Sequence, residues 1–189
     1  MKCANHENTL MPDFDRTRWI DVLNDGTRVN VRPIQEDDIE RERAFIMGLS
    51  PQSRRLRFLG QIGEPSMALL KRLTHVDYLR DAALVGLADG DSSDRFLGVG
   101  RFSTSSDGRQ CECAVAVLDD WQHLGLGVVL MKHLIAVARD RGIGTMYSFD
   151  LAENRAMADL ADYLGFDRHL DCDDASMVMY TLRLTQHAG

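Results

Sequence analysis

One segment, residues 111–142, limits the folds open to this chain more than any other, because it joins a strand to a helix through bare backbone. Residues 111–118, CECAVAVL, predict a strand. The next residues, DDWQHLGLG, end with Gly125 and Gly127, and the apolar run over 128–138 has helical spacing. Glycine inside a helix costs roughly 0.5–1 kcal/mol relative to alanine. Its presence here indicates that the start of the helix must leave its backbone uncovered.

Such a junction is suited to binding an anion. The first N–H groups of a helix have no partners within it, and the helix dipole is positive at that end. Gly125 and Gly127 would let a phosphate approach without meeting a Cβ atom. The chain lacks the third glycine of a dinucleotide-binding loop and the Gly-Lys-Ser/Thr of a nucleoside triphosphate loop. A glycine turn that serves only close packing is the alternative.

Strand and helix patterns continue on both sides of this unit and predict a mixed α+β fold. The turn clusters DGDSSD and SSDGR separate three strands into an antiparallel meander. We expect residues 1–18 to form a flexible N-terminal arm and residues 19–189 a single domain. The predicted strands are 27–34, 82–88, 96–103, 111–118, 145–151, 166–170 and 177–184, and the predicted helices are 35–47, one starting at Ser50-Pro51, 65–73, 128–138 and 154–164.

Composition argues against several classes of protein. The net charge of −7 argues against a nucleic-acid-binding surface, and no apolar run approaches the ~18 residues of a membrane span. The N-terminus lacks the basic-then-apolar order of a secretory signal, and the four cysteines show no disulfide framework. We therefore expect a cytoplasmic protein with no membrane partner. The motif HLDCDD, residues 169–174, lacks the paired spacing of a metal site, and we expect no metal.

Acidic side chains are concentrated near the C-terminus. Residues 147–189 hold 8 acidic and 3 basic side chains, whereas residues 1–146 hold 21 and 19. An acidic surface of this kind can attract a cationic substrate. An acidic surface that only keeps the protein soluble is the alternative.

Several motifs, in this order along the chain, resemble the GNAT acetyltransferase superfamily. The segment QHLGLG, from Gln122 to Gly127, is similar to its Gln/Arg-x-x-Gly-x-Gly/Ala signature. The segment ENRAMADLADYLGF is similar to the second signature, an asparagine followed by a helix that ends in Leu-Gly-Phe. The segments VRPIQEDD, LSPQSRRLRF, LTHVDYLRDAALVG and ECAVAVLDDWQ resemble the GNAT domain of bacterial protein lysine acetyltransferases. The match spans about residues 27–184.

The resemblance implies the GNAT fold and acetyl-CoA as the acetyl donor. It implies a mostly antiparallel sheet with helices on both faces, in which strands 111–118 and 145–151 splay apart to admit the pantetheine arm. The first of these strands would pair with that arm, and the start of the following helix would surround the pyrophosphate. Asn154 would contact the cofactor or an ordered water, and it is also a candidate helix cap. The residues so assigned are Val115, Ala116, Val117, Gln122, His123, Leu124, Gly125, Leu126, Gly127, Val128 and Asn154.

Two sites depart from the family pattern. His123 and Leu124 stand where relatives often have glycine and a basic residue, so one fixed charge near the phosphates is missing. Ala161 stands where many relatives carry a tyrosine that protonates the departing thiolate. Tyr163 lies about 200° around the helix from Ala161 and cannot simply take that role. Three arginines, at positions 54, 55 and 57, are candidates for a phosphate contact, with a solvated helix face as the alternative.

Glu112 is the candidate catalytic base. Direct transfer of an acetyl group to an amine needs a neutral nitrogen, whereas a free lysine amine has a pKa of about 10.4. Glu112 lies in an otherwise apolar strand and matches the glutamate of the corresponding strand in the lysine acetyltransferases. We expect burial to raise its pKa toward that of a useful base. A strand-edge glutamate that faces water is the alternative, and we interpret Cys111 and Cys113 on the opposite face as packing residues.

These motifs predict an N-acetyltransferase that moves an acetyl group from acetyl-CoA to a primary amine in a ternary complex, without a covalent enzyme intermediate. The resemblance favours a protein lysine as the acceptor. A small-molecule amine or polyamine acceptor is one alternative, and a non-catalytic acyl-CoA-binding sensor is another. A homodimer is left open.

Overall fold

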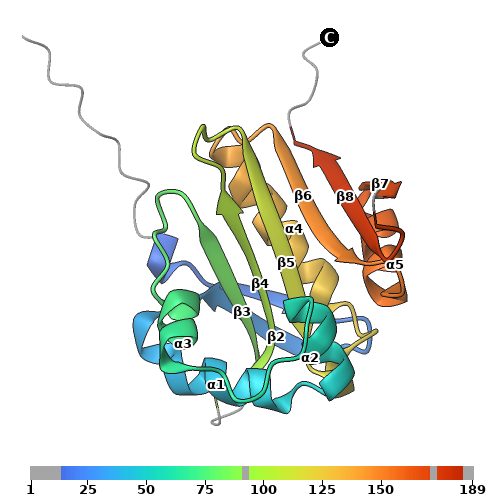
Figure 1. Ribbon diagram of the computed structural model, residues 1–189. Helices are drawn as coiled ribbons and strands as arrows, with labels where there is room; N and C mark the ends of the chain where they lie inside the picture. The colour runs from blue at the N-terminus through green and yellow to red at the C-terminus, as the bar shows by residue number, and fades with distance from the viewer. Residues whose placement is uncertain (1–13, 91–93, 171–173, 185–189) are drawn as a thin grey trace, which may run out of the picture.

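A twisted sheet of eight strands, in the order β1-β2-β3-β4-β5-β6-β8-β7, forms the centre of the described part of the protein (Figure 1). The structure, a computed structural model, describes residues 14–90, 94–170 and 174–184. Neighbouring strands are antiparallel except β5 and β6, which are parallel. The strands are β1 (Trp19–Val22), β2 (Arg28–Pro33), β3 (Ala82–Ala88), β4 (Phe96–Thr104), β5 (Gln110–Val117), β6 (Thr145–Leu151), β7 (Asp167–Leu170) and β8 (Met177–Arg183). The helices are α1 (Ile39–Gly48), α2 (Pro51–Phe58), α3 (Met67–Thr74), α4 (Leu126–Asp140) and α5 (Arg155–Leu164), with the short 3-10 helices η1 (Phe14–Arg16), η2 (Glu36–Asp38) and η3 (Asp119–Trp121).

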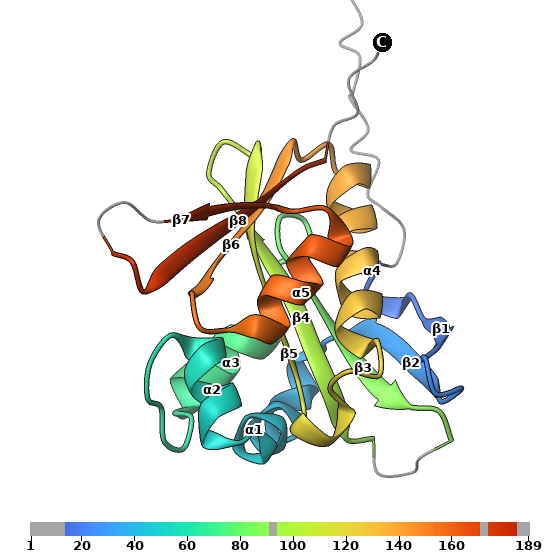
Figure 2. The same cartoon turned by 90° about the vertical axis from the view of Figure 1, so that its right-hand side faces the viewer.

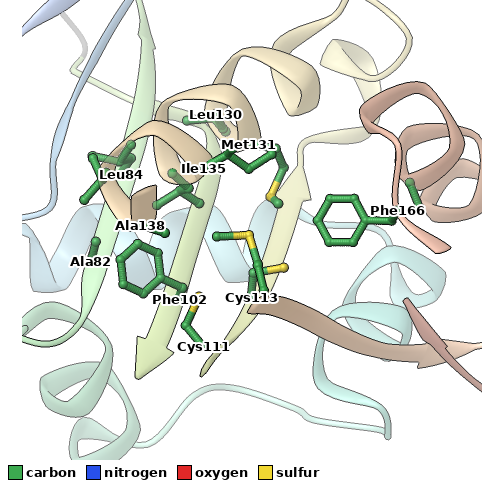
Figure 3. Packing of buried hydrophobic residues seen from close by; sticks show 14 of the residues in the cluster. Ala82, Leu84, Phe102, Cys111, Cys113, Leu130, Met131, Ile135, Ala138 and Phe166 are labelled. Carbon is green, nitrogen blue, oxygen red and sulfur yellow. The ribbon is translucent and has the colours of Figure 1, made fainter. Parts of the chain in front are cut away.

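Helices cover both faces of the sheet and produce two hydrophobic cores. Helices α4 and α5 lie on one face, and α1, α2 and α3 lie on the other (Figures 1 and 2). On the first face, Leu130 and Ile135 of α4 pack with Leu84 and Phe102 of the sheet (Figure 3). The apolar spacing that predicts the 128–138 helix is therefore the face that α4 buries.

Helix α4 lies close to the sheet because Gly98 of β4 has no side chain that would separate the two layers. A Cβ atom built on Gly98 would lie 3.0 Å from Leu130 Cδ1, 3.1 Å from Leu126 Cδ2 and 3.3 Å from the carbonyl oxygen of Ala116. A valine at this position would need still more room between two packed layers.

We expect Gly98→Val to lower the free energy of unfolding by about 1–3 kcal/mol, because it overpacks the contact between α4 and β4. Urea denaturation measures this change. Gly63→Val is the matched control, since a Cβ at Gly63 meets nothing within 4 Å. An equal loss of stability in both variants would contradict the packing argument.

The strands and helices predicted from residue 27 onward are confirmed, with small shifts of their ends. β1 is not predicted, because four residues at a sheet edge give too short an alternation to recognise. The 3-10 helix η1 lies inside the segment expected to be a flexible arm, and the Phe14 ring contacts the rings of Trp19 and Tyr78 at centroid distances of 6.2 and 5.4 Å. The flexible arm over residues 1–18 and the single domain over residues 19–189 stay predictions, and residues 1–13 lie outside the described residues.

In the part of the chain that the structure describes, no helix is long and apolar enough to cross a membrane. No group of three or more His, Cys, Asp or Glu side chains within the same residues is placed to hold a metal ion. Cys172 of the HLDCDD motif lies outside the described residues. Cys111 and Cys113 are buried in the core beside α4 (Figure 3), where burial raises the pKa of Cys111 to about 12 and also raises that of Cys113. Both thiols have the surroundings expected of packing residues.

Candidate active site

The parallel strands β5 and β6 pair only at their first residues. Residues 110–112 align with residues 145–147, and no later pair joins these two fully described strands. Beyond that point the strands move apart toward their C-terminal ends (Figure 1). The sheet therefore contains a split that begins after Glu112 and Tyr147, as the resemblance implies.

The edge of β5 that faces the split carries backbone groups available to a ligand. The N–H of Leu118 donates to the carbonyl of Leu97 in β4 at 2.9 Å, which fixes the alternation along β5. Because backbone groups of a strand alternate between its two sides, Val115 and Val117 turn theirs toward the split, whereas Ala116 turns its own toward β4. An extended chain that contains amides can hydrogen-bond to such an edge as an added strand. Ala116 offers a ligand its side chain rather than its backbone.

The loop after β5 ends in a helix N-terminus without a side-chain cap. Gly125, the residue before α4, has a φ of 95°, and no side chain among the described residues caps this helix. The N–H groups of its first turn consequently have no acceptor within the helix. A Cβ built on Gly127 would lie 3.7 Å from Leu160 of α5 and 3.8 Å from Val117 of β5, so this turn faces the space between β5 and α5.

His123 and Leu124 have different positions in this loop. His123 is exposed and has a φ of 62°, a left-handed conformation that favours glycine. This conformation accounts for the glycine that the GNAT signature often carries at that position. Leu124 packs against the core, and its carbonyl accepts a hydrogen bond from the N–H of Asn24 at 2.9 Å. The turn between β1 and β2 thereby holds the loop in place.

The split, the start of α4 and the start of α5 open into one groove of about 1150 Å³. Pockets for small molecules commonly measure about 300–1,000 Å³, so this groove suits a long ligand. Leu124 and Leu126 are not among the residues that line it, and Leu126 is buried against the sheet. The residues predicted to bind the cofactor that do line the groove are Val115, Ala116, Val117, Gln122, His123, Gly125, Gly127, Val128 and Asn154.

Asn154 caps α5 and also holds a buried carboxylate. Its Oδ1 accepts a hydrogen bond from the N–H of Met157 at 3.2 Å, which confirms the predicted cap. Its Nδ2 donates to both carboxylate oxygens of Asp150 at 3.0 Å. Asp150 is 8% exposed, and burial raises its pKa. The side chain of Asn154 thus links the start of α5 to β6 in the groove wall. Its contact with a cofactor stays a prediction.

Glu112 lies at the last paired position of β5, on the face opposite Cys111 and Cys113. The prediction that it is buried is wrong, because its side chain is exposed and does not line the groove. Ser103, which pairs with Glu112 from β4, is exposed as well. Tyr147, which pairs with Glu112 from β6, is only partly buried. This corner of the sheet extends beyond the cover of α1, α2 and α3. A group that approaches from that side can therefore reach Glu112.

The three arginines of α2 have different surroundings. Arg54 donates to two backbone carbonyls at the end of α1, and Arg55 pairs with Glu153. Of the three, only Arg57 lines the groove. Burial, followed by the charge of a neighbouring arginine, lowers the pKa of Arg57 to about 10, while Glu42 and Glu112 act in the opposite direction.

Two polar residues of β6 in the groove wall were missed by the sequence analysis. Ser148 and Asp150 alternate with Tyr147 and Phe149, and both are buried on the α4 and α5 side of the sheet. The alternation of side chains along the strand was the available signal. Ser148 and Asp150 lie two and four residues after Met146, so they share its face of the sheet, and Met146 is fully buried.

Comparison with known proteins decides the family. The model of the acetyltransferase (GNAT) family matches residues 54–166. The acetyltransferase PA5475 of Pseudomonas aeruginosa is 49% identical over 166 residues, which cover 88% of this chain and 89% of that protein. The chain belongs to the GNAT acetyltransferase family. As a GNAT enzyme it is an acetyl-CoA-dependent acetyltransferase that acts on an amine acceptor.

Relatives of known structure and function extend this comparison. The GNAT domain of S. lividans PAT superposes with a TM-score of 0.80 at 26% identity, covering 88% of this chain and 96% of that domain. The match confirms the mixed α+β GNAT fold. The acetyltransferase Pat of Mycolicibacterium smegmatis is 31% identical over 139 residues, which are 71% of this chain and 40% of Pat. The match therefore covers less than half of Pat.

The groove of this GNAT enzyme fits acetyl-CoA on its own geometry. The free edge of β5 suits the amides of a pantetheine arm, and the uncapped start of α4 suits a pyrophosphate. Gly127 leaves the space in front of that helix start open. The two features lie along one continuous groove, as a cofactor with both groups requires.

Proposed function

We propose that this GNAT enzyme acetylates lysine side chains of a protein by direct transfer in a ternary complex. The observation that carries the proposal is the position of Glu112, which is exposed at the beginning of the split. A base at an open surface is accessible to a lysine that belongs to a macromolecule. The resemblance of residues 111–121 and their flanking motifs to protein lysine acetyltransferases supports the same acceptor.

The cofactor would be held by the groove residues that the sequence singles out. The backbone groups of Val115 and the N–H of Val117 bind the pantetheine arm, and the turn from His123 to Val128 surrounds the pyrophosphate. Bound acetyl-CoA supplies the acetyl group as a thioester. Gln122 fixes the end of β5, because its Nε2 donates to the carbonyl of Val117 at 3.1 Å.

Glu112 accepts a proton from the substrate ammonium group, directly or through one water. The nitrogen lone pair then becomes available for attack, which an ammonium ion does not allow. General-base assistance of this kind contributes roughly 10²–10⁴-fold in rate. Because Glu112 does not line the groove, we expect it to act on the acceptor and not on the cofactor.

Release of free thiol from acetyl-CoA across a panel of amines tests the proposal. The panel contains a library of peptides that each carry one central lysine, together with Nα-acetyl-lysine amide, spermidine and an amino sugar. We expect kcat/KM to be highest for lysine peptides. A higher value for spermidine or the amino sugar would support a small-molecule acetyltransferase. Tight binding of acetyl-CoA with no turnover on any amine would support the sensor.

The acidic C-terminal part of the chain leads to a separate prediction about acceptor charge. Asp150, Glu153 and Asp159 of this part line the groove. We expect cationic acceptors, with a KM for the acceptor that rises with ionic strength because salt screens exposed charges over a distance of about 10 Å at 0.1 M. Initial rates at several salt concentrations measure this, with the KM for acetyl-CoA followed in parallel. Equal turnover of cationic, neutral and anionic acceptors would contradict the prediction.

A further inference from the structure

β6 places a hydroxyl group at the point where the sheet splits. Ser148 directly follows Tyr147, the last residue of β6 that pairs with β5. The residue is 3% exposed and lies in the groove wall, on the same face as the buried residues Met146 and Asp150. Glu112 and Ser148 therefore lie within one residue of the same paired position, on opposite faces of the sheet.

The hydroxyl of Ser148 has no hydrogen-bond partner among the residues that the structure describes. Asp150, two residues away on the same face, accepts hydrogen bonds from Asn154 and from the N–H of Leu151. A buried hydroxyl without a partner costs about 1–3 kcal/mol, so such groups are rare unless a ligand or water completes them. Ser148 is not among the fully enclosed atoms that lack a partner, which indicates that its oxygen reaches the groove.

Helix α5 does not offer a hydroxyl in that place. Ala161 is 1% exposed and contributes only a methyl group to the core. Tyr163 lines the groove, but it is 67% exposed and Lys132 Nζ lies 5.5 Å from the centroid of its ring. Its hydroxyl therefore belongs to the exposed outer part of the groove, and the tyrosine common at the Ala161 position in relatives is absent here.

We propose that Ser148 is a catalytic residue, whose hydroxyl donates a hydrogen bond to the sulfur of the thioester as the carbon–sulfur bond breaks. The inference rests on the proposed direct transfer to an amine. The electron pair of the broken bond goes to sulfur, and the serine proton stays on oxygen because an alcohol is a weaker acid than a thiol. The nitrogen, which is positively charged after its attack, loses its surplus proton to solvent, and the thiolate takes a proton from solvent afterwards. Hydrogen bonds to a charged acceptor are about twice as strong as neutral ones, so the bond strengthens as charge develops.

Two neighbouring groups are weaker candidates for this role. Asp150 lines the same groove and burial raises its pKa, but its oxygens already accept hydrogen bonds from Asn154 and Leu151. To donate from Oδ2, it would have to be protonated there and give up the hydrogen bond that this oxygen accepts from Asn154. Cys113 shares the face of Ser148 from β5, but it is buried in the core and does not line the groove.

Substitution of Ser148 tests the inference through turnover and through the bound product. We expect Ser148→Ala to lower kcat about 10- to 100-fold, with the Kd for acetyl-CoA changed less than about twofold. Ser148→Thr keeps the hydroxyl and should recover most of the rate. Ser106→Ala, which removes an exposed hydroxyl from the turn between β4 and β5, is the control and should behave as wild type.

Titration of bound coenzyme A gives a readout that needs no acceptor. The ultraviolet absorbance of the thiolate reports its ionisation, and loss of a donor should raise the pKa of the bound thiol by about one unit in Ser148→Ala. Full kcat together with an unchanged titration would overturn the inference, as would loss of acetyl-CoA binding itself. A larger shift in Asp150→Asn than in Ser148→Ala would assign the role to Asp150 instead. Failure of the wild type to acetylate any lysine defeats the proposed acceptor, whereas the thiol titration still decides on Ser148.

Discussion

Glu112→Gln is expected to lower kcat/KM by roughly 10²–10⁴-fold near neutral pH, while the affinity for acetyl-CoA stays almost unchanged. Glutamine keeps the size and the hydrogen-bonding ability of the side chain, but it cannot accept a proton from an ammonium group. The cofactor affinity should persist because Glu112 is exposed and lies outside the groove. Steady-state kinetics measure the first quantity and calorimetric titration the second.

The pH dependence of this loss separates a base from other roles. A lysine amine has a pKa of about 10.4, so a larger fraction of the acceptor is neutral at high pH and needs less assistance. The deficit of the variant should therefore shrink as pH rises. Glu64→Gln, which changes another exposed glutamate, is the control. Full activity in Glu112→Gln would assign proton removal to water or another side chain, and loss of folding would make Glu112 structural.

Gly127→Glu should weaken binding of acetyl-CoA at least about tenfold, equivalent to 1.4 kcal/mol, without destabilising the protein. The Cβ atom itself fits, since its nearest neighbours would lie at ordinary contact distances of 3.7 and 3.8 Å, and the GNAT signature admits alanine at this position. Glutamate in the first turn of a helix is also more favourable than glycine. Its carboxylate reaches the groove where we place the pyrophosphate, and the two negative charges repel each other. Calorimetry and urea denaturation together should show weaker binding and equal or greater stability.

The ligand itself supplies a control for this prediction. Acetyl-pantetheine lacks the pyrophosphate, so its affinity should be the same for Gly127→Glu as for wild type. Equal losses for both ligands would place the effect elsewhere than at the phosphate. Gly125→Val is a less clear test, although it should also weaken binding at least about tenfold. Its φ of 95° strains any other residue, and its Cβ would lie 3.1 Å from the side chain of Asn24.

The groove illustrates what the sequence can establish about this protein. The strand, glycine turn and helix from 111 to 142 are local features, because strand alternation, glycine and apolar spacing act over a few residues. They predict β5 and α4 and the bare helix start between them. The ordered motifs then imply the split, which is confirmed by the short register between β5 and β6.

Glu112 shows where such reasoning stops. The alternation Cys-Glu-Cys indicates that one face of β5 is buried, and Cys111 and Cys113 are on that face. It does not say how far α1, α2 and α3 extend over the other face, since contacts between residues distant in the chain set their position. Ser148 was missed for the same reason. A serine in a strand is ordinary until the structure shows that its face is buried and that no strand pairs beside it.

The split sheet also bears on the order of events during a working cycle. The groove is lined by residues of α2 on one face of the sheet and of α4 and α5 on the other, so it passes through the split. Glu112 is exposed beside the beginning of the split and outside the groove. Under the proposed role of Glu112, donor and amine acceptor use different approaches to the reacting atoms, so release of coenzyme A does not require prior release of the acetylated acceptor.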